Sequence, residues 1–210
     1  MLHWNTVNEL LKEYLMLLMN AEEFSSFRLV GGTSLSLQLG HRISIDIDLF
    51  TDATYGSIDF DAIDVFLKQQ FKYVEGSLGM LPGMGRAYFI GDNKYNLIKL
   101  DVFYTDSFIQ EALVIDNVRM ATIDEIVAMK MDVVQRGGRK KDFWDLHELL
   151  DNYSIHRMLD LHKIRYPYSH DRLLILNNLK DFEQAESDFN PTCLRGKYWE
   201  IIKLDFVEAL

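Results

Sequence analysis

Cysteine, proline and long apolar runs are all scarce in this chain of 210 residues. It contains one cysteine and three prolines. A single thiol, Cys193, excludes an internal disulfide and is typical of a reducing compartment, so we expect a cytoplasmic protein. No apolar run approaches the roughly 20 residues that a membrane-spanning helix needs, and the N-terminus lacks the basic segment of a signal peptide. The sequence therefore predicts no membrane partner.

Positive charge is also in short supply. The 22 Lys and Arg residues are outnumbered by 32 Asp and Glu residues, which leaves a formal net charge of −10. Broad, non-specific binding of nucleic acid depends on a basic surface, so this balance argues against it. A local basic groove is still compatible with the sequence. Its densest candidate, which could equally be a solvated loop, consists of Arg136, Arg139, Lys140 and Lys141 around two glycines.

A glycine-rich turn stands where an apolar strand meets a short helix. The strand ends at Val30, and the turn reads Gly31, Gly32, Thr33 and Ser34. Glycine has no Cβ, so its backbone can approach a ligand closely, and N–H groups at a helix N-terminus bind anions such as phosphate. Thr33 and Ser34 would add hydroxyl and N–H donors. The alternative is a plain strand-to-helix turn, which also favours glycine.

Two aspartates, Asp46 and Asp48, follow on the next strand. Residues two apart on a strand point to the same face, roughly 7 Å apart. Carboxylate oxygens suit Mg²⁺ or Mn²⁺. The alternatives are an exposed strand face or a salt-bridged pair. Together with the glycine turn, the aspartate pair indicates chemistry on a nucleoside triphosphate (NTP).

The segment from Gly31 to Phe50, GGTSLSLQLGHRISIDIDLF, resembles the signature of the AbiEii/AbiGii toxin family of nucleotidyltransferases. The resemblance extends over most of the chain and weakens over residues 176–186. It implies metal-dependent transfer of a nucleoside monophosphate from an NTP to an acceptor hydroxyl. It also implies the toxin of a type IV toxin–antitoxin pair, with a separate antitoxin protein as partner. The implied acceptor is RNA, such as a tRNA 3′ end, and a protein acceptor stays open.

A third carboxylate, Asp101, lies in the middle of an apolar strand. A lone aspartate there is costly to bury unless it is paired or bound to a metal. The simpler alternative is a charge pair with Lys99 on the same face. In the family pattern a later strand supplies such a residue, so the resemblance assigns Asp101 to the metal and to the role of general base.

Lys130 interrupts the apolar stripe of the helix that follows Thr122. The stripe otherwise consists of Ile123, Ile126, Val127 and Val134, so a lysine there either snorkels to the edge or reaches a buried anion. The family has a lysine in this helix, which implies contact with the triphosphate. Asp132 lies on another face, and we expect it to be solvated.

A later block resembles a second family segment through Lys141, Asp142 and Asp145. The resemblance implies that Lys141 meets phosphate while Asp142 or Asp145 orients basic side chains or the nucleotide. Carboxylates also stabilise helix N-termini, so helix capping is the alternative for both. His41 and Arg42, just before the aspartate pair, could meet the acceptor or brace the loop. Arg136 is a further supporting candidate.

Strand patterns concentrate in residues 27–119 and helix patterns in residues 122–210, an α+β arrangement. We expect a nucleotidyltransferase-like small mixed sheet with flanking helices, followed by a helical C-terminal half. The predicted domains are residues 1–120, which hold the metal site, and residues 121–210, which complete the cleft. Expected strands are 27–30, 45–50, 86–90, 95–104 and a short pair within 113–119. Expected helices are 4–19, one capped by Thr33 or Ser34 that ends at Leu39, 59–71, and two that begin near Thr122 and Lys141; residues 76–85 are a loop.

Three other interpretations of the aspartate pair remain open. A haloacid-dehalogenase-type phosphatase uses the first aspartate as nucleophile, but it lacks an upstream glycine turn. A metal-dependent glycosyltransferase is normally longer, with a Rossmann-like start that residues 1–30 do not provide. A degenerate transferase fold could serve as a non-catalytic binding module, although all three carboxylates and Lys130 are present here.

Overall fold

Seven strands form one mixed sheet in the computed structural model, which describes residues 1–210. Their order across the sheet is β3-β4-β5-β2-β1-β7-β6. The central strand β2 is parallel to β5 and antiparallel to β1. The strands are β1 (Arg28–Leu29), β2 (Asp46–Thr51), β3 (Tyr73–Gly76), β4 (Gly85–Asn93), β5 (Asn96–Tyr104), β6 (Leu113–Ile115) and β7 (Val118–Met120).

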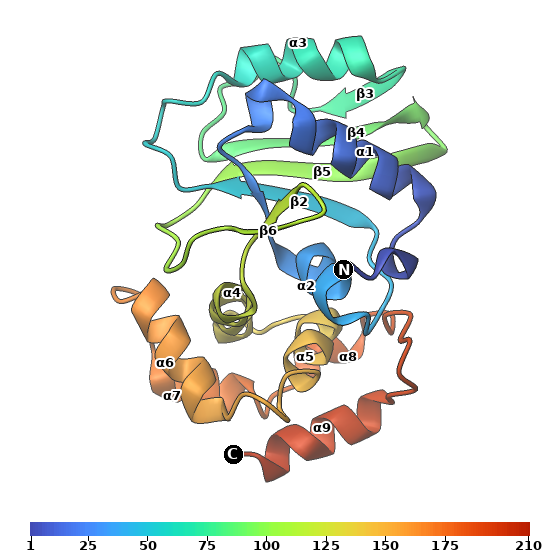
Figure 1. Cartoon of the computed structure of the whole chain (residues 1–210). Coiled ribbons are helices and arrows are strands. Elements are labelled where there is room, and N and C mark those ends of the chain that lie inside the picture. Colours follow the sequence, from blue (N-terminus) through green and yellow to red (C-terminus); the bar gives the residue numbers. More distant parts are fainter.

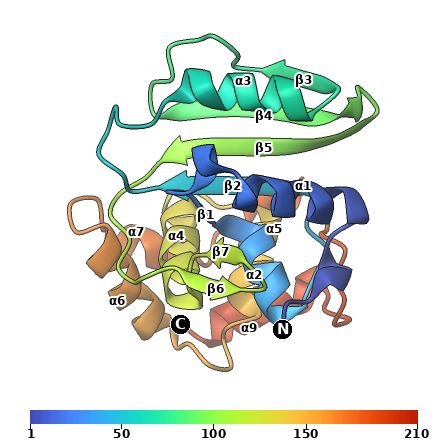
Figure 2. The same ribbon diagram turned by 45° about the horizontal axis from the view of Figure 1, so that its top comes forward.

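Helices cover the sheet from two sides (Figures 1 and 2). One side carries α1 (Glu9–Asn20) and α3 (Phe60–Gln70). The other side carries α2 (Gly31–Leu39) and the C-terminal helices α4 (Ile123–Gln135), α5 (Lys140–His147), α6 (Ile155–Arg165), α7 (Arg172–Asn178), α8 (Glu183–Glu186) and α9 (Trp199–Glu208). Two 3₁₀ turns complete the set, Trp4–Thr6 and Glu22–Phe24. No helix is both long and apolar enough to span a membrane.

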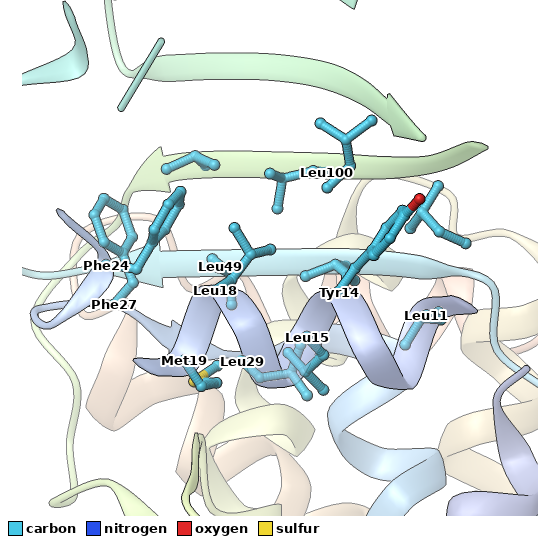
Figure 3. Close-up of a cluster of buried hydrophobic side chains, with 14 of the residues drawn as sticks. Leu11, Tyr14, Leu15, Leu18, Met19, Phe24, Phe27, Leu29, Leu49 and Leu100 are labelled. Carbon is cyan, nitrogen blue, oxygen red and sulfur yellow. The ribbon is translucent and has the colours of Figure 1, made fainter. Parts of the chain in front are cut away.

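The first hydrophobic core lies between the sheet and α1 (Figure 3). Leu49 on β2 and Leu100 on β5 are fully buried there, in the same cluster as Leu11, Leu15 and Leu18 of α1. Because side chains alternate along a strand, this packing turns the even-numbered positions of β2 to the opposite face. The core therefore determines where the aspartates of β2 point.

A second core joins the C-terminal helices. Its buried members include Val127 of α4, Phe143 of α5, Leu159 of α6 and Phe206 of α9. The sheet half contributes few residues to it, namely Val30 and Leu35 at the start of α2. The two cores follow the predicted division near residue 120, although that division into domains stays a prediction.

The α+β architecture agrees with the prediction, and most boundaries agree within two residues. Asn8 caps α1, which begins at Glu9 and not at Trp4, because residues 4–6 form a separate 3₁₀ turn. Strand β3 was missed, because its sequence, Tyr-Val-Glu-Gly, lacks clear alternation and pairs only with β4.

The predicted cap of α2 is wrong. The helix begins at Gly31, and neither Thr33 nor Ser34 caps it. Gly31 adopts a φ of 65°, a left-handed conformation that turns the chain directly from the strand into the helix. Ile45, the first residue of the expected strand 45–50, precedes β2 and is 65% exposed.

Candidate active site

The strand pair β2–β5 brings the three predicted carboxylates together. Asp48 lies directly opposite Asp101 in the register of this parallel pair, and Asp46 lies opposite Lys99. Since Ile47, Leu49 and Leu100 fill the first core, the carboxylates occupy the face turned away from it. Neighbouring strands are about 4.8 Å apart, so the Asp48 and Asp101 side chains are immediate neighbours.

The glycine turn lies against this group. The backbone N–H of Val30 donates to the carbonyl oxygen of Asp48 at 2.9 Å. A Cβ added at Gly31 would lie 2.8 Å from Asp48 Oδ2, and one at Gly32 would lie 2.2 Å from an Arg42 guanidinium nitrogen. Both positions therefore require glycine, because a carboxylate and a guanidinium already occupy the space that a side chain would take.

The hydroxyls of Thr33 and Ser34 are engaged within the protein. Both side chains are buried. The Thr33 hydroxyl donates to the Asp46 carbonyl oxygen and lies 2.7 Å from the Ser44 hydroxyl, and the Ser34 hydroxyl accepts from Gln38. Their hydroxyls thus position β2 and α2, which leaves close approach to a nucleotide to the backbone of Gly31 and Gly32.

Negative charge is only partly neutralised at the carboxylates. Lys99 pairs with Asp101, as the simpler alternative predicted, and Lys141 Nζ lies 3.7 Å from Asp46 Oδ2. Asp48 has no such partner. Burial, followed by repulsion from Asp101 and Asp46, raises the pKa of Asp48 to about 6 from its ordinary 3.8.

This donor set fits a hard divalent cation. Such an ion would relieve the repulsion around Asp48, and oxygen ligands are what Mg²⁺ and Mn²⁺ prefer. No three acidic, His or Cys side chains form a ready metal cage, since lysines hold two of the carboxylates. Mg²⁺ usually takes only one or two carboxylates and fills its remaining positions with water and substrate phosphate.

A cavity of about 540 Å³, here called the central cavity, opens beside the carboxylates. One part of its wall is charged, and the rest is largely apolar and aromatic. The charged part consists of Asp48, Asp101, Lys130, Asp132, Arg136, Arg139, Lys141 and Asp142, together with the backbone of Gly31 and Gly32. A second cavity of about 390 Å³ shares Arg139 and Lys141 with the first, and it is also lined by Arg42, Asp46 and Phe189.

Asp145 of α5 is the hub of a buried ionic network. Arg42 binds it in a bidentate manner, with Nε 2.6 Å from Oδ1 and Nη2 2.8 Å from Oδ2. His41 Nε2 lies 2.8 Å from Oδ1, and Lys130 Nζ lies 2.7 Å from Oδ2. Burial alone would raise the pKa of Asp145, but Lys130 and Arg42 hold it well below its usual range. His41 and Arg42 therefore brace the loop before β2, one of the two predicted roles.

Asp142 combines two of the predicted roles. Its Oδ2 accepts from the backbone N–H of Arg139 at 3.2 Å, which caps α5, and its Oδ1 lies 2.6 Å from Lys130 Nζ. Lys130 is therefore buried between Asp142 and Asp145 and does not snorkel. Burial would lower the pKa of Lys130, but the two carboxylates raise it, so the ammonium stays charged at the wall of the central cavity.

The expectation for Asp132 is wrong. This residue is 7% exposed, because α6 packs against α4 and covers its side chain. Its carboxylate lies 2.5 Å from Arg136 Nη2 and 3.6 Å from His162 Nε2. Arg136, predicted as a supporting residue, is thus tied to Asp132 while the rest of its side chain is exposed at the central cavity.

Sequence reasoning missed three residues of the aromatic part of the central cavity. Tyr166 and Asp106 line it, and Arg165 holds both of them. No motif marks these positions. Tyr166 follows an ordinary amphipathic helix, and Asp106 lies in a loop more than 50 residues away.

The sheet, the carboxylates and the cation-lined cavity together define a protein of the nucleotidyltransferase fold. A family model described as nucleotidyl transferase AbiEii toxin, type IV toxin–antitoxin system, matches residues 14–209. The chain therefore belongs to the AbiEii family of nucleotidyltransferase toxins, and not to the phosphatases or glycosyltransferases that use an Asp-x-Asp pair.

Individual relatives are distant. An uncharacterised protein of Aquifex aeolicus is 26% identical over 190 residues, covering 85% of this chain and 84% of its own. A candidate nucleotidyltransferase of Helicobacter pylori superposes with a TM-score of 0.61 at 21% identity, covering 96% of this chain and 93% of that one. MenT4, a nucleotidyltransferase toxin of Mycobacterium tuberculosis, gives a TM-score of 0.50 at 16% identity, covering 93% and 83%. At these identities the structures support the fold alone.

Proposed function

We propose that this protein transfers a nucleoside monophosphate from an NTP to an acceptor hydroxyl in a reaction that depends on Mg²⁺ or Mn²⁺. The observation that carries the proposal is the placement of Asp46, Asp48 and Asp101 on one face of β2 and β5, directly against the Gly31 turn. That arrangement opens into a cavity large enough for a nucleotide. The presence of all three carboxylates together with Lys130 supports an active transferase rather than a degenerate binding module.

Cationic side chains of the chain would hold the triphosphate. Arg139 and Lys141 line both cavities, and Arg136 lines the central one. Lys130 adds a buried charge whose position is set by Asp142 and Asp145. A divalent cation held by Asp46, Asp48 and Asp101 would neutralise the triphosphate and assist deprotonation of the acceptor.

Asp101 is the residue we assign as proton acceptor for the incoming hydroxyl. In the present arrangement Lys99 holds its carboxylate. Substrate and cation binding would therefore have to draw Lys99 away from Asp101, toward phosphate or solvent. Lys99 is 41% exposed at its side chain, so nothing encloses it in its present position.

We further propose RNA as the acceptor, with a tRNA 3′ end as the first candidate, a cognate antitoxin as protein partner and the cytoplasm as the site of action. The family's toxin–antitoxin setting supports the partner. The rim of the second cavity supports a single-stranded nucleic acid, because it combines Arg139 and Lys141 with the fully exposed ring of Phe189. Exposed aromatic rings stack on unpaired bases, and cations track the backbone.

Label transfer tests the reaction. The purified protein is incubated with Mg²⁺ and each of the four α-³²P-labelled NTPs, in the presence of total tRNA and total cell protein. We expect label in tRNA with the wild type. Asp46→Asn, Asp48→Asn and Asp101→Asn should each reduce it by about 100-fold or more, because each removes one carboxylate from the metal and base positions.

The matched control is Asp151→Asn, which removes an exposed carboxylate that lines neither cavity. It should retain wild-type transfer. Label in protein in place of tRNA would overturn the RNA acceptor and keep the reaction class. Absence of label in both, with folded protein and all four NTPs, would contradict the transfer reaction.

A further inference from the structure

The central cavity changes character along the β2–β5 pair. Asp48 and Asp101 face each other in the middle of the strands, whereas Phe50 and Tyr104 follow toward their C-terminal ends, the ring of Tyr104 being part of the first core. Beyond them the chain continues through Thr105 to Asp106, and α4 and α6 supply the opposite wall with Met129, Val133 and Tyr166. The five residue-to-residue steps from Asp101 to Asp106 extend at most about 17 Å, a span that an extended NTP can bridge.

Charge decides which way a nucleotide lies in this cavity. The triphosphate must lie at the carboxylate end, because Lys141, which lies 3.7 Å from Asp46, is there together with the carboxylate oxygens that would bind a cation. The sugar and base must then lie at the aromatic end. Stacking on aromatic rings is favourable for any base, so rings alone would not discriminate among the four NTPs. A polar group at that end is needed for selection.

A buried arginine shapes the aromatic end. The Arg165 side chain is fully buried and paired with Glu125 of α4. Its Nε donates to the Tyr166 hydroxyl at 3.0 Å, and its Nη2 donates to the Thr105 hydroxyl at 3.0 Å and to the Asp106 carbonyl at 3.3 Å. One guanidinium therefore holds the tyrosine of the helical half beside the Asp106 loop of the sheet half.

The carboxylate of Asp106 differs from its acidic neighbour in this part of the cavity. Asp132 is held by Arg136 and His162, whereas the side chain of Asp106 makes no hydrogen bond or ion pair although it lines the cavity. Burial raises the pKa of Tyr166, Arg165 opposes this effect, and the charges of Asp132 and then Asp106 add to it. The charge of Asp106 therefore influences the ionisation of the Tyr166 hydroxyl.

We propose that Asp106 selects NTPs whose base carries an exocyclic amino group, so that the protein accepts ATP, CTP or GTP and discriminates against UTP. A carboxylate only accepts hydrogen bonds, and the amino groups of adenine, cytosine and guanine donate them. Uracil offers one N–H between two carbonyl oxygens, which repel a carboxylate. This inference rests on the proposed nucleotide site and adds its base specificity.

Equilibrium binding tests the base preference assigned to Asp106 without requiring turnover. Binding of the four α,β-methylene NTP analogues, in the presence of Mg²⁺, is measured by titration calorimetry on the full chain. We expect the uridine analogue to bind about 10- to 100-fold more weakly than the tightest of the other three, the value of a hydrogen bond to a charged group. Asp106→Asn, which can both donate and accept, should reduce that gap to about threefold or less.

Two further variants separate selection from general effects. Asp151→Asn should leave unchanged the difference in affinity between the uridine analogue and the tightest of the other three. Tyr166→Ala should weaken all four analogues by a similar factor, about 5- to 100-fold, because a lost stacking platform affects every base. Equal binding of the four analogues by the wild type, or an unchanged gap in Asp106→Asn, would overturn the inference.

The outcomes distinguish this inference from the proposed reaction. Selective binding without label transfer would keep Asp106 as the base-reading residue and reject the transfer reaction. Transfer from all four NTPs at equal rates, with equal binding, would reject the role of Asp106 and keep the reaction. Failure to bind any of the four analogues would reject the nucleotide site and the inference together.

Discussion

Asp48 and Asp145 are two buried aspartates in opposite electrostatic environments. Asp145 is surrounded by Arg42, Lys130 and His41, so its negative charge is fully matched. Asp48 is buried beside two further carboxylates, and its pKa is raised to about 6. A stabilising network would give each of the three carboxylates a cationic partner, and Asp48 has none. A perturbed carboxylate without a cationic partner, at the wall of a cavity, is the pattern expected of a ligand site.

The free-energy cost of ionising Asp48 in the folded state predicts an unusual dependence of protein stability on pH. The folded state keeps the Asp48 proton up to about pH 6, whereas the unfolded chain releases it near pH 3.8. The free energy of unfolding therefore falls as pH rises through this window, and the whole loss is present above pH 6. A shift of this size corresponds to about 3 kcal/mol, which partial exposure reduces to about 1–2 kcal/mol. Asp48→Asn should be more stable than the wild type by that amount near pH 7.5.

Urea unfolding with EDTA checks this at two pH values. The stability gain of Asp48→Asn should disappear near pH 3, where Asp48 is protonated in the folded wild type and largely so in the unfolded chain. Asp151→Asn should show no such pH-dependent difference. If Asp48→Asn is more stable than the wild type at both pH values, or at neither, then the ionised Asp48 side chain is not destabilised by its two neighbouring carboxylates. Added Mg²⁺ should stabilise the wild type and have little effect on Asp48→Asn.

At the scale of single elements, the start of α2 is the decisive feature. Gly31 permits a left-handed residue at the strand-to-helix junction, and its missing side chain leaves room for the Asp48 carboxylate. The helix has no side-chain cap, so its first N–H groups are available to an anion. Both properties belong to the junction and not to the rest of the helix.

Gly31→Ala should therefore lose both stability and nucleotide binding. The positive φ costs about 1–2 kcal/mol for any L-residue, and the new methyl group would displace Asp48. Gly79 provides a matched control, because its φ of 66° is nearly the same as that of Gly31 and a Cβ there meets nothing within 4 Å.

The comparison separates strain from function. Both variants are examined by thermal unfolding and by binding of an NTP analogue with Mg²⁺. Gly79→Ala should lose a similar amount of stability and bind normally. Equal binding by the two variants would show that close approach of Gly31 to Asp48 does not matter for the site.

At the scale of the whole molecule, the candidate site lies between two hydrophobic cores. The first core sets β2 and β5, and the second sets α4 and α5. Asp145 connects them, because it binds Arg42 from the sheet half and Lys130 from the helical half. The network thus fixes the helical half against the loop that precedes the carboxylates.

Asp145→Ala should lower the free energy of unfolding by about 3–5 kcal/mol, since it leaves buried cations without their partner. Chemical denaturation measures this change. Lys72→Ala is the contrasting variant, because it removes an ion pair with Asp92 in which both side chains are largely exposed. That change should stay within about 0.5 kcal/mol. A loss below about 1 kcal/mol for Asp145→Ala would contradict its role as the link between the halves.

The family, the fold class and the three carboxylates could be predicted from the sequence because they rest on local patterns. The alternation around Ile47 and Leu100 determines which face of each strand is buried, and the glycines before α2 mark a turn whatever packs around it. The prediction that Asp46 and Asp48 share one face needed only that alternation, and parallel pairing of β2 with β5 brings Asp101 beside Asp48. These properties depend on neighbours along the chain or on one strand pair.

Only the tertiary structure decided how the other charges are used. Arg42 and Asp145 are 103 positions apart, and nothing in either segment specifies the other as its partner. The burial of Asp132 and the gathering of Asp106, Arg165 and Tyr166 likewise depend on how the helices of the second core pack against the end of β5. Long-range contacts of this kind are set by the packing of whole elements, so the sequence by itself determined the carboxylates and the tertiary structure determined what surrounds them.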